Sequence, residues 1–258
     1  MKHAGMNSGD DVNSFVYWLH DATDSQIEEI ASDDSQALMS VRRYLFGGRP
    51  RYAAIVALEK APPQRWETGL SLDRLLHSAQ DSDWRPVSID VYVHNDEPQF
   101  SLLYETGVSA SSKQRRHVFI ADTSESMRQL IDRGGRVVDF VTYSDAHETR
   151  YVAIYESSEN WDVWFEKSNG KFKRRQGRMR LNPRIVRSLP DQHGAYSAIL
   201  SLEVNRGSRI FRTGLTADEL ARVLDRHNAA LTDFQVVGTA KGPSFDALIE
   251  SRAAQTSP

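Results

Sequence analysis

The sequence predicts an α+β fold of five tandem repeats, each built of a strand, a helix and two further strands. Three observations predict it. An aromatic residue followed by small and aliphatic residues recurs at intervals of 45 to 51 residues, a second apolar strand precedes each copy, and a hydroxyl-bearing helix start precedes most of these pairs. A repeat of this size cannot bury its own hydrophobic face, so adjacent repeats are expected to pack together.

Each repeat opens with a short strand rich in aromatic residues. These strands are expected at Phe15–Leu19, Trp66–Thr68, His117–Ile120, Trp161–Phe165 and Arg209–Thr213. Their spacing favours aromatic side chains that lie in the core or between repeats, with a stacking platform for glycans or peptides as the alternative.

A capped helix follows the first strand. A Ser or Thr hydroxyl at the N-cap accepts a hydrogen bond from a free backbone N–H, and an apolar residue four positions later begins the buried stripe. The pairs are Thr23 with Ile27, Ser71 with Leu75, Thr123 with Met127, and Thr216 with Leu220. Gln26 and Glu219 add capping boxes to the first and last of these helices.

A β-hairpin completes each repeat. Apolar and polar residues alternate through Val87–Val91, with the period of two that is typical of a strand with one buried face. The closing strand is the recurring aromatic segment, found at Tyr52–Ile55, Phe100–Leu103, Tyr151–Ile154, Tyr196–Ile199 and Phe245–Leu248. Short connections between repeats favour a three-stranded antiparallel meander with the helix on its side.

The repeats are expected to form one domain over residues 14–254, between short tails at 1–13 and 255–258. Its units are expected at 14–61, 62–112, 113–158, 159–205 and 206–254. If the strand near Phe15 pairs with the strand near Phe245, the units close into a propeller-like ring. Otherwise they form a curved solenoid with two open edges. We favour the ring, because open sheet edges template aggregation.

One sequence pattern runs through these segments. It is carried by Trp84–Ile89 with Tyr92, Phe100–Glu105, Arg51–Ile55, Arg150–Glu156 and Gly214–Thr216, and it covers nearly the whole chain. The pattern resembles the repeats of the family called bacterial tandem repeat domain 1. Similar repeats form the N-terminal region of fungal polyglycine hydrolases, whose catalytic part is a separate β-lactamase-like domain. The resemblance therefore implies a repeat module without a catalytic centre of its own, often joined to other modules.

This chain departs from the family at one recurring position. The usual Trp after the closing strand is replaced by Val56, Tyr104, Tyr155 and Leu200. A family site that uses this Trp is therefore not expected here.

Composition excludes several classes of function. Of the 258 residues, 40% are hydrophobic, which is enough for a sizeable core, and none is cysteine. Disulfides, Cys-ligated zinc, iron–sulfur clusters and thiol nucleophiles are thereby excluded. No apolar run approaches the roughly 18 residues of a membrane helix, and Met1–Asp11 lacks the apolar segment of a secretory signal. We expect no cofactor and no transmembrane segment, while the compartment and the oligomeric state stay open.

The net charge of −3 conceals a basic stretch. Residues 167–187 contain nine Lys or Arg and no acid, whereas residues 1–36 contain eight acids and one Lys. Clustered cations release counterions when they meet a polyanion. The predicted anion-binding or partner-binding residues are Lys171, Lys173, Arg174, Arg175, Arg178 and Arg180. We favour a solvated helix face that is balanced by the acidic N-terminal segment. If the stretch binds a partner, we expect a protein or an acidic polymer and not a specific nucleic acid.

Three hairpin loops carry imidazoles and carboxylates at equivalent positions. The residues are His94, Asp96, Asp145, His147, Asp191 and His193. In a ring these loops would share one face, and such side chains could hold zinc or manganese. Asp, Asn and Gly are also the residues that tight turns require. We favour turn chemistry and predict no metal site, while keeping these six residues as a possible loop-face site.

No catalytic residue is predicted. Ser168 and Lys171 match the Ser-x-x-Lys spacing of penicillin-recognising serine enzymes, but Ser168 stands where the other repeats have a helix N-cap. The sequence therefore favours a non-catalytic tandem-repeat binding or scaffold module over an enzyme. The alternative is an accessory or substrate-gripping domain of a serine hydrolase that acts on glycine-rich or cell-wall peptides.

Overall fold

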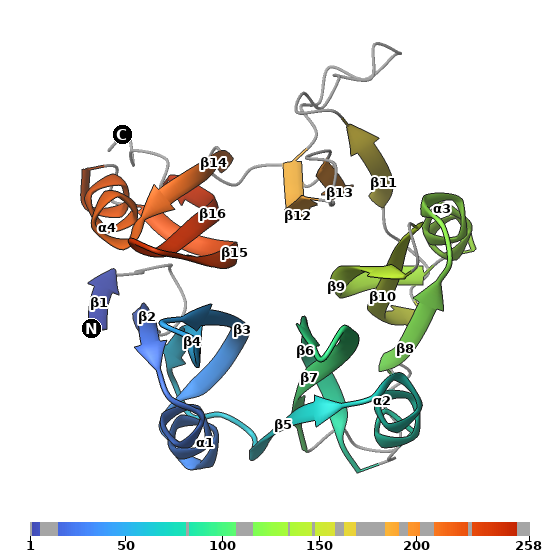
Figure 1. Cartoon of the computed structure of the whole chain (residues 1–258), viewed down its shortest axis with the longest axis horizontal. Coiled ribbons are helices and arrows are strands. Elements are labelled where there is room, and N and C mark those ends of the chain that lie inside the picture. Colours follow the sequence, from blue (N-terminus) through green and yellow to red (C-terminus); the bar gives the residue numbers. More distant parts are fainter. Residues whose placement is uncertain are drawn as a thin grey trace, which may run out of the picture. The chain divides into compact units, whose positions relative to one another are not determined.

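Most of the described chain is β-strand in the computed structural model (Figure 1). The structure describes residues 2–5, 15–80, 83–106, 116–133, 135–145, 148–157, 163–168, 184–190, 196–201, 209–226 and 229–251. The chain divides into two compact units. Unit 1 comprises Met1–Ala61 together with Glu203–Pro258, and unit 2 comprises Pro62–Leu202.

Unit 1 contains the first and fifth repeats as two antiparallel sheets. The strands are β1 (Lys2–Gly5), β2 (Phe15–Ala22), β3 (Ala37–Phe46), β4 (Arg49–Leu58), β14 (Arg209–Thr216), β15 (Ala229–Thr239) and β16 (Gly242–Ser251). The helices are α1 (Asp24–Ser32) and α4 (Ala217–Arg226). The strand orders are β1-β2-β4-β3 and β14-β16-β15.

Unit 2 contains the second, third and fourth repeats as three antiparallel sheets. The strands are β5 (Gln64–Leu70), β6 (Arg85–His94), β7 (Glu97–Glu105), β8 (Arg116–Ala121), β9 (Gly135–Asp145), β10 (Glu148–Ser157), β11 (Val163–Ser168), β12 (Arg184–Pro190) and β13 (Tyr196–Ser201). The helices are α2 (Leu72–Ser78) and α3 (Ser124–Asp132). The strand orders are β5-β7-β6, β8-β10-β9 and β11-β13-β12. None of the helices in the described parts of either unit is long and apolar enough to cross a membrane.

Repeated three-strand sheet units are present, but the predicted meander order is wrong. In every sheet the closing strand of the repeat lies in the centre, between the first strand and the other hairpin strand. The reason is visible in β4, where every residue from Tyr52 to Ala57 is buried. A strand that is apolar on both faces belongs in the middle of a sheet, where both faces and both edges are covered. The helix crosses from the first strand to the second over one face of its sheet (Figure 1).

The predicted α+β class and the propeller-like closed ring are also wrong. The described residues form separate antiparallel sheets with four short helices, and among them there is no closed ring or propeller. The ring required the strand near Phe15 to pair with the strand near Phe245. Instead β2 pairs with β1 and β4, and β16 pairs with β14 and β15, so the edges of both strands are already used. The two strands meet through side chains, with Trp18 edge-on to Phe245 at 5.5 Å between ring centroids.

The predicted helix starts are confirmed where the structure describes them. Thr23, Ser71 and Thr123 are N-caps, and each hydroxyl accepts a hydrogen bond from the backbone N–H three residues later. Thr216 and Glu219 exchange reciprocal side-chain bonds at the start of α4, as a capping box requires. The helix expected after Ser168 lies outside the described residues.

A recurring bulge interrupts the first strand of three repeats two residues before the helix cap. The register between the first and central strands shifts at this position in the first, second and fifth repeats. The bulged residue has a left-handed backbone in each case: Asp21 at φ 60°, Gly69 at φ 71° and Gly214 at φ 70°. Glycine adopts this conformation without steric cost, so Asp21 is the exception among the three.

A buried charge pair joins the two repeats of unit 1. The side chain of Arg42 on β3 is 1% exposed, and its Nη2 atom lies 3.8 Å from Oδ1 of Asp233 on β15. Arg42 also donates to the backbone oxygen of Val41 at 2.9 Å. The surrounding core combines residues of both repeats, including Trp18, Ile55, Leu220 and Phe245. First and fifth repeats are therefore one packed body.

Unit 2 uses a carboxylate at the equivalent place between its second and third repeats. Oδ2 of the buried Asp139 on β9 accepts from the backbone N of Ile89 at 2.9 Å and from Oγ of Ser88 at 3.0 Å, both on β6. Within the third repeat, buried Glu156 on β10 pairs with Arg116 on β8 and Arg136 on β9, and Arg116 also donates to the backbone oxygen of Pro86 on β6 at 3.3 Å. Packing between repeats is thus completed by charged groups that find hydrogen-bond donors inside the protein.

Candidate functional site

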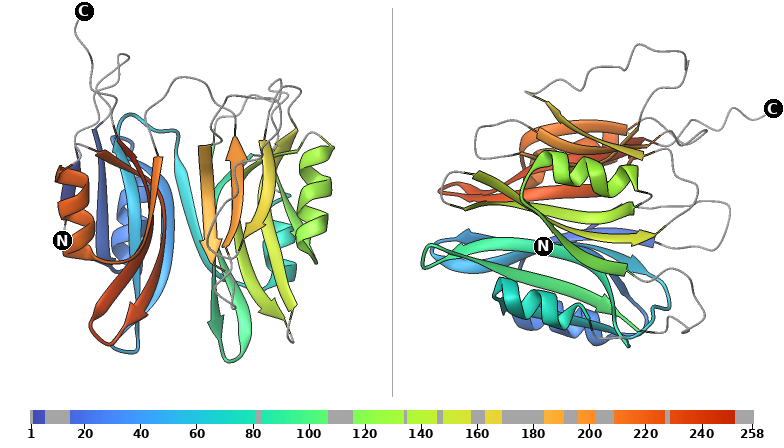
Figure 2. Two further views of the ribbon diagram at one scale, coloured as in Figure 1. Left: turned by 90° about the horizontal axis from the view of Figure 1, so that it is seen from above. Right: turned by 90° about the vertical axis from the view of Figure 1, so that its right-hand side faces the viewer.

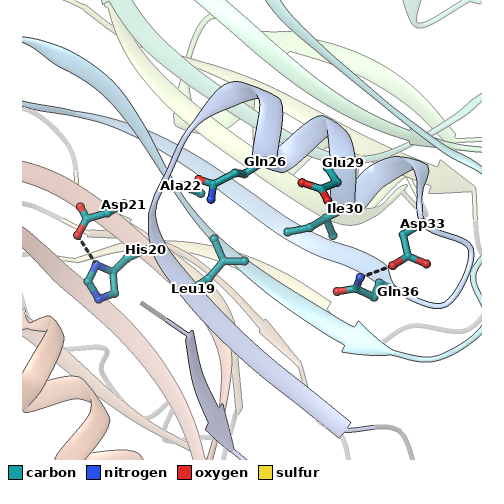
Figure 3. Close-up of a pocket in the computed structure, with 9 residues that line it drawn as sticks. All are labelled: Leu19, His20, Asp21, Ala22, Gln26, Glu29, Ile30, Asp33 and Gln36. Atoms are coloured by element: carbon teal, nitrogen blue, oxygen red, sulfur yellow. Dashed lines mark hydrogen bonds and ion pairs between the residues drawn. The ribbon is translucent and has the colours of Figure 1, made fainter.

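A pocket of about 230 Å³ opens between β2 and α1 in the first repeat (Figure 3). Its lining residues come from the end of β2, from α1 and from the turn after the helix. They are Leu19, His20, Asp21, Ala22, Gln26, Glu29, Ile30, Asp33 and Gln36. The lining therefore combines an apolar part with three carboxylates and one imidazole.

The first repeat differs from the second at four of the residues that line this pocket. Counted from the N-cap, the differences are Leu19 for Glu67, Asp21 for Gly69, Ala22 for Leu70 and Ile30 for Ser78. In the second repeat, Oγ of Ser78 donates to Glu67 at 2.7 Å and so ties helix to strand. The first repeat has apolar side chains at both of these places, and it has a smaller residue where the second repeat has the buried Leu70.

Asp21 is held in its left-handed conformation by Tyr44. The backbone N–H of Asp21 donates to Oη of Tyr44 at 3.0 Å, and the Tyr44 hydroxyl donates in turn to Oδ1 of Asp21. In the second repeat a Cβ placed on Gly69 would lie 3.8 Å from Oη of Tyr92, so a tyrosine covers the bulge there as well. The added carboxylate is what distinguishes the first repeat. Asp is one of the few non-glycine residues that adopt this conformation readily, and here it adds a carboxylate to the lining of the pocket.

His20 is positioned by its neighbours on three sides. Its ring stacks on Trp18 at 5.5 Å and meets Phe245 edge-on at 6.3 Å. Its Nδ1 atom lies 2.9 Å from Oδ2 of Asp21. Because an ionised carboxylate can only accept, Nδ1 carries the proton in this contact. Nδ1 of the imidazole is thereby committed to Asp21.

The electrostatics of the pocket favour a cation. Burial acts to raise the pKa of Asp21, but the hydrogen bond from Tyr44 and the nearby His20 outweigh it, so the pKa of this carboxyl lies below its ordinary value. Hydrogen bonds from Ser35 lower the pKa of Asp33. Both carboxylates are therefore ionised at neutral pH, and no Lys or Arg is among the residues that line the pocket. Within the described ranges, no three His, Asp or Glu side chains gather closely enough to hold a metal ion.

Acid is expected to destabilise unit 1 through Asp21. The folded-state pKa lies below the unfolded value of about 3.9, so the stabilisation is present above that value and is lost as pH falls through the folded pKa. Unfolding followed by tryptophan fluorescence between about pH 5 and pH 2 should therefore show falling stability. Asp21→Asn should flatten this dependence, and Tyr44→Phe, which removes one of the bonds that lower the pKa, should flatten it in part. An unchanged slope in Asp21→Asn would contradict the assignment.

The residues predicted from the sequence lie elsewhere. The basic residues Lys171, Lys173, Arg174, Arg175, Arg178 and Arg180, and the loop residues His147, Asp191 and His193, are outside the described residues. Asp145 is the last residue of β9, and nothing is described of its side chain. His94 and Asp96 are exposed at the β6–β7 hairpin, where Asn95 and Asp96 have φ values of 52° and 62°. A two-residue turn of this kind favours Asn and Asp for backbone reasons, which agrees with the preferred interpretation of that loop.

Sequence reasoning missed His20 and Asp21. The available signal was positional, because Gly69 and Gly214 stand two residues before their helix caps and Asp21 stands in the same place.

No known protein-family model matches this chain, and no curated protein matches it significantly.

Proposed function

We propose that this chain is a non-catalytic tandem-repeat binding or scaffold module, and that the pocket of its first repeat takes a cationic group of a protein partner. The cation would be a Lys or Arg side chain or a free amino terminus. The observation that carries the proposal is the divergence of one repeat, in which Asp21 occupies a left-handed position that two other repeats give to glycine. The contacts with Tyr44 hold Asp21 in this conformation, which places a carboxylate on the pocket.

The lining suits a long cationic side chain. Leu19, Ala22 and Ile30 offer an apolar surface for an aliphatic stem, while Asp21, Glu29 and Asp33 offer acceptors for its charged end. Charge-assisted hydrogen bonds to carboxylates are about twice as strong as neutral ones. The resemblance to bacterial tandem repeat domain 1 agrees with a module of this kind, because the catalytic part of the similar polyglycine hydrolases is a separate domain.

The proposal is tested with a pair of peptides that differ only in charge. An acetylated and amidated Gly-Gly-Arg-Gly-Gly peptide is titrated into the protein and compared with its citrulline analogue, which has the same shape without the cation. We expect the arginine peptide to bind at least about tenfold more tightly, as a charged hydrogen bond implies. Asp21→Gly should remove most of that difference. This substitution introduces the residue that the second and fifth repeats carry, so the fold should be retained.

Asp73→Ala is the matched control, because it removes an exposed carboxylate from the start of α2 in another repeat. Equal binding of the two peptides, or equal affinity in Asp21→Gly and the wild type, would refute the pocket assignment. Turnover of peptidase, esterase, lactamase or phosphatase substrates that is abolished by one point substitution would refute the non-catalytic assignment. Cleavage of a glycine-rich peptide would favour the hydrolase alternative.

A further inference from the structure

A second surface of unit 1 combines exposed apolar and basic side chains at two hairpin tips. We define the basic–apolar tips as residues 45–51 between β3 and β4 and residues 237–243 between β15 and β16. Leu45 is 53% exposed, Phe46 39% and Val237 62%. Large apolar side chains that remain in water next to one another are typical of an interaction surface.

The two tips lie directly beside each other. A Cβ placed on Gly238 would lie 1.6 Å from the backbone oxygen of Leu45, so the backbones of β3 and β15 approach more closely there than any other residue would allow. Figure 2 (left) shows the two hairpins of unit 1, in blue and red, extending side by side to the same end. Leu45, Phe46 and Val237 therefore lie at the same end of unit 1.

Both tips are held in defined conformations. Gly47 and Gly48 have φ values of 57° and 72°, the two-residue turn that closes a hairpin tightly. In the other tip, Thr239 donates to the backbone oxygen of Gly242 at 2.7 Å and accepts from the backbone N of Lys241 at 3.2 Å. The tips present their side chains without needing to reorganise.

The charge of the tips is opposite to that of the whole chain. Arg49 and Lys241 are exposed and Arg51 is half-buried. Neither tip contains an acidic residue, whereas the chain has a net charge of −3. A surface that combines apolar side chains with cations is complementary to a lipid surface, where anionic headgroups cover an apolar layer of acyl chains.

We propose that the basic–apolar tips dock unit 1 onto an anionic lipid surface. Leu45, Phe46 and Val237 enter the boundary between headgroups and acyl chains, and Arg49, Arg51 and Lys241 contact lipid phosphates. A lipid surface fits better than a protein partner, because projecting tips need a groove on a folded protein, whereas a fluid interface accepts them without a matching shape. The site is separate from the acidic pocket, so either assignment can fail without the other.

The test is cosedimentation of the full chain with vesicles at low and physiological salt. Vesicles of phosphatidylcholine with about a third phosphatidylserine should retain the protein, and pure phosphatidylcholine vesicles should retain much less. Binding should weaken as salt rises, because the headgroup attraction is screened. Arg49→Ser and Lys241→Ser should each lower the partition coefficient about fivefold. The triple variant Leu45→Ser, Phe46→Ser, Val237→Ser should lower it strongly at unchanged charge.

Val93→Ser is the matched control. Val93 is 64% exposed at the β6–β7 hairpin, but this hairpin carries Asp96 and Glu97 and no Lys or Arg. We expect no change in vesicle binding from this variant. Circular dichroism and melting temperature should confirm that every variant is folded, since all the substituted side chains are exposed.

Three results would overturn the proposal. The first is no retention by phosphatidylserine vesicles at low salt, and the second is retention that the apolar triple variant does not reduce. The third is binding to soluble polyglutamate that equals vesicle binding and depends only on Arg49 and Lys241. That last outcome would assign the tips to an acidic protein segment.

Discussion

Arg42→Met is expected to lower the free energy of unfolding of unit 1 by about 3–5 kcal/mol, the largest effect of any single substitution proposed for this chain. The guanidinium is 1% exposed and lies 3.8 Å from the carboxylate of Asp233, itself buried in the core shared by the first and fifth repeats. Without the arginine, the carboxylate loses this cation while it stays buried. Breaking a buried pair in this way costs more than the pair contributes.

Chemical denaturation with melting temperature as a second measure would check this expectation. For a chain of this size, a loss of about 4 kcal/mol corresponds to a fall of roughly 8–16 °C. The double variant Arg42→Met, Asp233→Leu should recover much of the loss, because no charge then remains buried. Arg212→Met is the control for charge removal, since Arg212 is exposed on β14 and the change should be within about 0.5 kcal/mol. A double variant that is less stable than Arg42→Met alone would contradict the explanation.

Asp139→Ala should destabilise unit 2 by about 3–4 kcal/mol. One carboxylate oxygen accepts from the backbone N of Ile89 and from the hydroxyl of Ser88, and all three residues are buried. Removing the carboxylate deletes two hydrogen bonds to a charged acceptor in the protein interior, and hydrogen bonds of this kind contribute about 1.5–3 kcal/mol each. The same substitution should loosen the contact between β6 and β9.

Hydrogen exchange at the Ile89 amide reports directly on this bond, and denaturant unfolding gives its effect on stability. Ser88→Ala removes one of the two donors and should cost only about 1 kcal/mol. Asp139→Asn keeps an acceptor oxygen and should fall between these two variants. Asp132→Ala removes an exposed carboxylate from the end of α3 and should leave both measurements unchanged. Equal protection of the Ile89 amide in Asp139→Ala and the wild type would refute the role of Asp139.

Local features of this fold could be predicted from the sequence. The N-caps at Thr23, Ser71 and Thr123 depend on a hydroxyl and the backbone of the next few residues, and they were found where expected. The hairpins likewise follow from alternation within single strands. The strand order could not be predicted in the same way, because a meander and a sheet with the closing strand in the centre give each strand the same local sequence pattern. A clue to a central strand was the unbroken apolar run from Tyr52 to Ala57, which is buried throughout in the structure.

The candidate site also divides into local features that the sequence predicts and long-range features that it does not. The basic stretch and the hairpin-loop residues were chosen by composition, and the described His94 and Asp96 belong to a tight turn. The pocket is lined by residues of β2, α1 and the turn after the helix, and these residues come together only when the first repeat is folded. Only comparison of the repeats, position by position, would have pointed to Asp21.

The sequence by itself determined the repeats, the four helix starts that the structure describes and the hairpins, because these depend on side chains and backbone groups within a few positions of one another. Tertiary structure alone decided which strand is central, that β2 and β16 do not pair, and that Arg42 meets Asp233. Those outcomes depend on which apolar surfaces, distant in the sequence, pack against each other and are removed from water. The free energy of that packing is the sum of many weak contacts, and no single segment carries it.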